Sequence, residues 1–367
     1  MKTYDLSDNR AHTDHLMFLD GHVNVQRYDV VKYPQIEAMS QRALGLFWRP
    51  EEVDLSKDRT DFQSAPDNVK HIFESNIKRQ IVLDSVQCRA PATVFMEIAS
   101  LPEVEDFIGK WSFFESIHSR SYTHILRNVY PNPTEVFDGV NEIREIAEMG
   151  RDISVWYDRL AYQNNLRSLR HMPGIAYNEF EHKTAIWMAL MASNSLEGLR
   201  FFLSFSSAFR SAENKMMEGN AKIMKLICRD EIEHLKFTVF ALLNLVKEDP
   251  DFAKIAALQR DAVMNMFRAV VAQEKEWGRY LMSKGSILGL NESLMSTYMD
   301  HLAYTRLADL GMEWDVKVRE NPLPFMDSWV SYGRRQAALQ ETENDAYMLG
   351  MLSLEGSDTD LSSITIG

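Results

Sequence analysis

Residues 115–118 read Glu-Ser-Ile-His and residues 231–234 read Glu-Ile-Glu-His, two copies of a Glu-x-x-His pattern in a chain of 367 residues. Each copy interrupts a stripe of apolar residues that recurs with the period of an α-helix, about 3.6 residues. At a spacing of three, the glutamate and the histidine share one face of a helix. The sequence therefore predicts two core helices that each carry a carboxylate and an imidazole into the protein interior.

Two further stripes of helical period each carry a single carboxylate, Asp84 in one and Glu197 in the other. Burying four unpaired carboxylates would cost far more free energy than the net stability of a whole domain. Two divalent cations would neutralise their charge, and oxygen ligands with one imidazole for each ion suit iron or manganese. We predict a dinuclear metal site with six ligands: Asp84, Glu115, His118, Glu197, Glu231 and His234.

The order of these ligands repeats along the chain. Asp84 precedes Glu115 by 31 residues, and Glu197 precedes Glu231 by 34, so a carboxylate helix is followed by a Glu-x-x-His helix twice. Ferritin-like bundles that bind two iron or two manganese ions combine carboxylates and Glu-x-x-His pairs in this way. The repeated order makes a chance occurrence of the six residues much less credible than a chance occurrence of one motif.

A third match to the pattern, at residues 179–182, provides an internal control. It lies 18 residues before Glu197 on what we expect to be the same helix. At the usual rise along an α-helix, the two positions are roughly 27 Å apart. This match cannot contribute to the same site, and we interpret it as a feature of the helix surface.

The rest of the sequence favours an all-α fold. Only 16 glycines and 11 prolines occur, which is few for a turn-rich sheet protein. Long helical patterns cover about residues 66–89, 102–129, 177–209 and 220–247, and further ones follow to about residue 339. We predict a ferritin-like helical bundle with additional helices and an N-terminal arm over residues 1–340. Residues 341–367 contain six acidic residues and no Lys or Arg, which predicts a flexible acidic tail.

Composition and charge argue against several other classes of protein. The net charge of −13 at pH 7 has the wrong sign for binding a nucleic acid backbone. Two cysteines, Cys88 and Cys228, cannot form a disulfide framework or a cysteine zinc site, so we expect a cytoplasmic protein with both thiols as small buried hydrophobes. The first 15 residues lack the apolar core of a signal peptide. The most apolar stretch, residues 185–205, is interrupted by charged residues and predicts a core helix, with no membrane span.

Several other side chains are expected near the ligands. Tyr122 follows the first histidine ligand by one helical turn, so its ring lies on the metal-bearing face. Phe201, Phe205 and Ile227 each lie one or two turns from a carboxylate ligand. These four positions fit ordinary core residues equally well, or a dry pocket around a phenol beside the metal ions. Asp230 directly precedes a glutamate ligand and is a candidate to hold a ligand histidine.

Four strings flank these residues: FWRPEEVDLSKDRTDF at 47–62, LDSVQ at 83–87, ESIHSRSYTHI at 115–125 and RDEIEH at 229–234. With the six ligands, they resemble the small, radical-generating subunit of class I ribonucleoside-diphosphate reductase. The resemblance extends from about residue 47 to the tail. It implies a ferritin-like homodimer whose di-iron centre reacts with O₂ and an electron donor, with manganese as the other candidate metal.

The resemblance also implies individual roles. Tyr122 corresponds to the tyrosine that is oxidised to a stable radical, and the three apolar residues named above correspond to its hydrophobic pocket. Trp48 corresponds to the tryptophan that supplies an electron during oxygen activation, and Asp230 to the aspartate that links it to His118. Tyr347 corresponds to the tyrosine that passes the radical to the large subunit, on which the end of the tail docks. There the radical serves to reduce ribonucleoside diphosphates to deoxyribonucleotides.

Three other hypotheses account for part of the sequence. A ferritin-like di-iron oxygenase or desaturase acting on its own apolar substrate would share the fold and the ligands, but Tyr122 and the tail would have no role. An iron-storage bundle leaves Trp48 unexplained, and a metal-free scaffold leaves four buried carboxylates without compensation. The absence of a Gly-rich phosphate-binding motif agrees with nucleotide binding by a partner. We expect the reductase subunit, with the oxygenase as the alternative.

Overall fold

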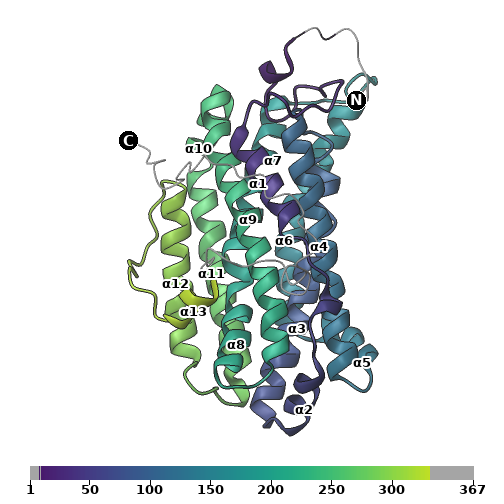
Figure 1. The fold of residues 1–367 in the computed structure, drawn as a ribbon. Helices are drawn as coiled ribbons and strands as arrows, with labels where there is room; N and C mark the ends of the chain where they lie inside the picture. The colour runs from purple at the N-terminus through teal and green to yellow at the C-terminus, as the bar shows by residue number, and fades with distance from the viewer. Residues whose placement is uncertain (1–7, 9, 331–367) are drawn as a thin grey trace.

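The computed structural model describes residue 8 and residues 10–330, and this part of the chain is built from α-helices. It contains no β-strand, only two isolated bridges, which pair Phe18 with Ala99 and Ile287 with Leu290. Figure 1 shows the longest helices lying side by side along the long axis of the molecule. The predicted all-α fold is confirmed.

No helix in this part of the chain combines the length and the apolar character needed to cross a lipid bilayer. The tail predicted over residues 341–367 lies outside the described residues.

The α-helices of the described residues are α1 Pro34–Gly45, α2 Ser56–Ser64, α3 Asp67–Gln87, α4 Pro102–Val129, α5 Pro133–Asp138, α6 Arg144–Leu169, α7 Glu179–Ser195, α8 Phe202–Glu213, α9 Glu218–Glu248, α10 Pro250–Leu258, α11 Arg260–Leu281, α12 Glu292–Asp309 and α13 Phe325–Val330. Two π-helical segments, Pro91–Phe95 and Leu196–Arg200, occur beside them. Short 3₁₀ turns lie at His12–Asp14, Pro50–Glu52, Gly139–Glu142 and Met282–Lys284.

Four long helices form the bundle that contains all six predicted ligands. α3 packs against α4, α4 against α9, and α7 against α9, with the second π-helical segment continuing from the end of α7. The remaining helices surround this bundle: α6 packs on α3 and α7, α1 covers α4, and α11 pairs with α12 (Figure 1). The ligand-bearing segments are therefore enclosed by other helices, which explains how their polar side chains become buried.

Capping residues define where two of these helices begin. α4 begins with Pro102, and proline suits this position because the backbone N–H groups of the first turn have no acceptor within the helix. α4 ends at Val129, before two closely spaced prolines. Asn178 caps α7, since its side-chain oxygen accepts hydrogen bonds from the backbone N–H groups of Phe180 and Glu181 at 3.0 and 3.3 Å. The predicted bounds of the α4 helix agree with the structure.

The N-terminus of α9 is held by a buried carboxylate on α2. Asp58 accepts hydrogen bonds from the backbone N–H groups of Gly219 at 2.9 Å and Asn220 at 2.5 Å. A Cβ atom on Gly219 would lie 2.7 Å from the carbonyl oxygen of Asp54, so only glycine fits this close approach. An anion at the positive end of the helix dipole stabilises α9, which carries two of the predicted ligands.

The prediction of a single α-helix over about residues 177–209 is wrong for the middle of that range. α7 ends at Ser195, the π-helical segment Leu196–Arg200 follows, and α8 begins at Phe202. π-helical segments are frequent at functional sites, and this one contains the predicted ligand Glu197. Nearly every side chain in this region is buried, so the apolar pattern gives no sign of a change in helical period.

The third Glu-x-x-His match lies in the first turn of α7. Glu179 is exposed, but His182 is fully buried, with Nε2 2.7 Å from Asn164 Oδ1 and Nδ1 3.1 Å from the Tyr177 hydroxyl. Our interpretation of this match as a surface feature is therefore wrong for the histidine. Burial, with the nearby Arg167 guanidinium, lowers the pKa of His182 to about 4.

Acidification should destabilise the protein partly through His182. In the unfolded chain its pKa is about 6.5, so between pH 6.5 and pH 4 the unfolded state binds the extra proton, and stability is lost as the pH falls. We expect the free energy of unfolding to drop by about 2 kcal/mol more between pH 7 and pH 5 in the wild type than in His182→Asn. Urea unfolding at both pH values measures this difference, and equal pH dependence in the two proteins would contradict it.

Candidate metal centre

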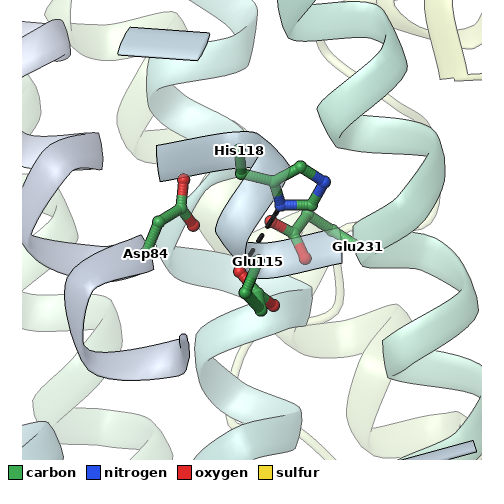
Figure 2. Close-up of side chains that lie close together, drawn as sticks. All are labelled: Asp84, Glu115, His118 and Glu231. Atoms are coloured by element: carbon green, nitrogen blue, oxygen red, sulfur yellow. Dashed lines mark ion pairs between the residues drawn. The ribbon is translucent and has the colours of Figure 1, made fainter. Parts of the chain in front are cut away.

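The six predicted ligands converge in the centre of the bundle. They come from four segments: Asp84 from α3, Glu115 and His118 from α4, Glu197 from the π-helical segment, and Glu231 and His234 from α9. The four carboxylate residues are 0% exposed. Figure 2 shows four of the six side chains pointing toward one another from three helices.

The ligands form two overlapping groups. In each group, every residue offers one oxygen or nitrogen atom, and these atoms all lie within 4.8 Å of one another. The groups are Asp84, Glu115, His118 and Glu231, and Glu115, Glu197, Glu231 and His234. Glu115 and Glu231 belong to both groups, so the arrangement fits two ions that share two carboxylates. Each group supplies three carboxylates and one imidazole, a donor set that suits iron or manganese.

Unpaired polar atoms at the centre of the cluster support this fit. Five of the predicted ligands each have one buried atom without a hydrogen-bond partner: Asp84 Oδ1, Glu115 Oε2, His118 Nδ1, Glu197 Oε2 and Glu231 Oε1. Three of these atoms lie together, because His118 Nδ1 is 3.4 Å from Glu115 Oε2 and 3.2 Å from Glu231 Oε1, in ion-pair contacts without hydrogen-bond geometry. Buried polar atoms are rarely left unpaired in proteins, and divalent cations would satisfy these five together.

Without cations, the cluster retains protons that ordinary carboxyl and imidazole groups would lose at neutral pH. Burial raises the pKa of Asp84 and of Glu197 well above the usual range, and the neighbouring carboxylates add to the effect. Burial would also raise the pKa of Glu115, but its contacts with the two histidines outweigh this and lower that pKa to about 2. Metal ions would replace the protons that Asp84 and Glu197 keep because their pKa values are raised.

Three carboxylate ligands each accept a hydrogen bond from a side chain outside the ligand set. Tyr122 donates to Asp84, Trp111 to Glu115, and Gln87 to Glu197. The sequence analysis identified only Tyr122 among these donors. Trp111 belongs to an apolar stripe and Gln87 is the last residue of α3, so neither position differs in pattern from an ordinary helix residue. These donors fix the orientation of the carboxylates.

Asp230 contacts both a predicted ligand histidine and a buried tryptophan. Asp230 Oδ2 lies 3.1 Å from His118 Nε2 and accepts a hydrogen bond from Trp48 Nε1 at 2.8 Å. The other oxygen, Oδ1, is 3.1 Å from the guanidinium of Arg229, a contact that the sequence analysis missed. Because His118 directs Nε2 to this carboxylate, Nδ1 is the nitrogen that faces the cluster.

Tyr122 and the three residues predicted around its phenol are all fully buried. Tyr122, Phe201, Phe205 and Ile227 are 0% exposed, and the two phenylalanine rings stack with centroids 5.6 Å apart. Burial, together with the carboxylate of Asp84, raises the pKa of Tyr122 well above its usual value, so the phenol is protonated.

The structure tests the predicted burial of the two cysteines. Cys228 is buried as expected, whereas Cys88 is partly exposed, so the expectation was wrong for that thiol. Burial raises the pKa of both thiols, which disfavours the thiolate. Tyr347 lies outside the described residues.

Comparison with known proteins agrees with this geometry. Residues 26–322 match the family model described as "Ribonucleotide reductase, small chain". The chain is 40% identical over 362 residues to the ribonucleoside-diphosphate reductase subunit beta of Buchnera aphidicola subsp. Acyrthosiphon pisum, covering 95% of this chain and 96% of that protein. It is 38% identical over 363 residues to the ribonucleoside-diphosphate reductase 1 subunit beta of Escherichia coli O157:H7, with the same coverage. The solved ribonucleotide reductase R2 subunit from Clostridium botulinum superposes with a TM-score of 0.74 at 25% identity, covering 86% of this chain and 94% of that one.

Removing one shared carboxylate should abolish binding of both ions. We expect the wild type to bind two Mn²⁺ per chain, and Glu115→Ala to bind neither tightly, because Glu115 belongs to both ligand groups. The paramagnetic resonance signal of free aqueous Mn²⁺ measures the bound fraction during a titration. Glu179→Ala, which alters the unrelated Glu-x-x-His match, is the control and should bind two. Two tightly bound ions in Glu115→Ala would contradict the shared-ligand arrangement.

Proposed function

The chain belongs to the family of ribonucleotide reductase small chains, and on that premise we propose that it holds a dinuclear metal centre and generates a stable radical on Tyr122. As a class I small, or beta, subunit it is part of a ribonucleoside-diphosphate reductase, an oxidoreductase that requires a large subunit. The radical that this chain supplies serves to reduce ribonucleoside diphosphates to deoxyribonucleotides. The observation that carries the proposal is the hydrogen bond from the buried Tyr122 hydroxyl to the ligand Asp84.

The surroundings of Tyr122 suit a phenol that loses an electron and a proton together. When bound, the metal ions supply the oxidising power through their reaction with O₂. The Tyr122 hydroxyl donates to Asp84, so the proton released on oxidation has an acceptor already in hydrogen-bond contact. We assign to the buried side chains of Phe201, Phe205 and Ile227 the exclusion of water from the phenol, which would protect the radical from reduction.

Trp48 is placed to deliver an electron toward the site. Its indole N–H donates to Asp230, and Asp230 contacts His118, so three side chains in contact connect the tryptophan to a metal ligand. The indole proton can move to Asp230 when the tryptophan is oxidised, which keeps the charge of the buried group constant. We assign to Trp48 the electron that comes from an external donor, and to this same route the transfer of the radical toward the large subunit.

The proposed partners are a second copy of the chain and the large subunit. Helices α1 and α4 pack together and expose Leu44 at 56% and Phe113 at 51%, and the Phe47 ring stacks on Phe113 with centroids 6.0 Å apart. Exposed apolar side chains gathered on adjacent helices are typical of a protein interface, and we propose this face for the homodimer. Residues 341–367 are proposed to dock on the large subunit, with Tyr347 as the exit of the radical.

The oxygenase alternative is less well supported. An enzyme that oxidised its own apolar substrate would need a cavity of several hundred Å³ beside the metal ions. The cavity that reaches the ligand His234, beside Trp111 and Asp230, has a volume of only about 10 Å³, close to that of a single water site. The relatives of the chain are reductase subunits, which also favours the radical function.

Tyr122→Phe should separate oxygen chemistry from reductase activity. We expect this variant to bind two metal ions and consume O₂ as the wild type does, but to lose at least ~100-fold of the activity measured with the large subunit. Tyr130→Phe, at the end of α4, removes a hydroxyl that contacts Glu74 at 3.4 Å and should retain activity. Full activity in Tyr122→Phe would indicate that the oxidising equivalent is stored on the metal ions.

Truncation before Tyr347 should abolish the reductase activity that requires the large subunit and leave the metal centre intact. We expect the shortened chain to bind metal ions and to form the radical, because all six ligands lie within the described helices. Reductase activity with the large subunit should be lost, and an assay with both subunits measures this. Loss of metal binding on truncation would contradict the assignment of residues 347–367 to partner docking.

A further inference from the structure

Tyr157, on α6, is a buried tyrosine to which neither the ligand set nor the proposed radical route gives a role. It is 4% exposed, and its hydroxyl donates a hydrogen bond to Gln87 Oε1 at 2.6 Å. Gln87 Nε2 in turn donates to Glu197 Oε1. A two-step chain of hydrogen bonds therefore leads from Tyr157 to a metal ligand, through side chains that are all buried.

The direction of this chain is determined by its acceptors. An ionised Glu197 carboxylate only accepts hydrogen bonds, so the NH₂ group of Gln87 has to face it. The amide oxygen of Gln87 then faces away from Glu197, and the Tyr157 hydroxyl is the side-chain donor that it meets. Without that hydroxyl, the amide oxygen of Gln87 loses its donor and is left buried, so the amide is held at the Glu197 end alone.

Ser193 also lies near the Tyr157 hydroxyl, with its oxygen 2.9 Å away. Its hydroxyl has another acceptor, the backbone carbonyl oxygen of Ala189 at 3.0 Å, so Ser193 does not depend on the tyrosine. The amide oxygen of Gln87, by contrast, does depend on the Tyr157 hydroxyl for its hydrogen bond. Ser193 thus provides a neighbouring hydroxyl that can be removed without breaking the link to the ligand.

We propose that Tyr157 is a positioning residue for Glu197, which it orients through Gln87. Glu197 is a member of only one of the two ligand groups, and it lies on the π-helical segment. Gln87 is the last residue of α3. Gln87 and Glu197 therefore both lie where regular α-helical geometry stops. The hydrogen bonds from Tyr157 to Gln87 and from Gln87 to Glu197 restrict where the carboxylate points.

The comparison with Tyr122 explains why the role of Tyr157 is positional. Tyr122 donates directly to a carboxylate, which can take up a proton. Tyr157 donates to an amide oxygen, which is too weak a base to accept a proton at neutral pH. Tyr157 therefore has no acceptor in hydrogen-bond contact that would allow it to lose a proton on oxidation. The inference rests on the proposed dinuclear centre and concerns only how one ligand is held.

Mn²⁺ titration of Tyr157→Phe tests this proposal, because the variant removes only the hydroxyl. We expect the dissociation constant of one of the two ions to rise about 10-fold, as is common when an outer hydrogen-bond partner of a ligand is lost, while the other ion is unaffected. Ser193→Ala and Tyr130→Phe are the matched controls and should bind both ions as the wild type does. Free Mn²⁺, followed by paramagnetic resonance, gives both constants without any activity assay.

A double-mutant cycle tests the intermediary. Gln87→Met keeps the length of the side chain but removes the amide, and it should weaken the same ion. If Tyr157 acts through Gln87, the variant with both substitutions should match Gln87→Met alone. Additive losses, or wild-type affinity for both ions in folded Tyr157→Phe or Gln87→Met, would overturn the proposal. Failure of the wild type to bind two ions would instead contradict the proposed function.

Discussion

Four carboxylates and two imidazoles meet in the dry interior of a helical bundle, and the rest of the structure depends on how their charge is compensated. Such a cluster is unfavourable without cations, because buried charges lose their hydration and like charges repel one another. Two divalent ions would compensate the charge of the four carboxylates. Glu115 and Glu231 are common to both ligand groups, an arrangement that fits a pair of ions that share ligands.

The residues around the cluster differ from one side to the other, and this asymmetry suggests a division of roles. On the side of Asp84 a tyrosine contacts the ligand directly, whereas on the side of Glu197 an amide separates the tyrosine from the ligand. Asp230 holds a ligand histidine and at the same time accepts a hydrogen bond from Trp48. A nearly symmetric ligand set thus has one side suited to oxidation of a phenol and one suited to holding a carboxylate still.

Much of the site could be predicted from the sequence because charged residues stand out within apolar helical stripes. The six candidate ligands and the helical class followed from that contrast and from the repeated order of the ligands, whereas Tyr122 was found by its spacing of one helical turn from His118. Gln87, Trp111 and Tyr157 could not be found in this way, because polar or aromatic residues at helix ends and in core stripes are ordinary. The π-helical segment and the burial of His182 depend on tertiary packing, which one-dimensional periodicity does not record.

The central claim is that the metal ions of this cluster oxidise Tyr122, and an X-band paramagnetic resonance spectrum tests it most directly. Metal-free protein is mixed with ferrous iron and O₂, and the visible absorption is recorded at the same time. The account predicts a tyrosyl radical signal together with the absorption of an oxidised di-iron centre. Oxidised metal with no organic radical, both with iron and after the same reconstitution with manganese, would contradict it.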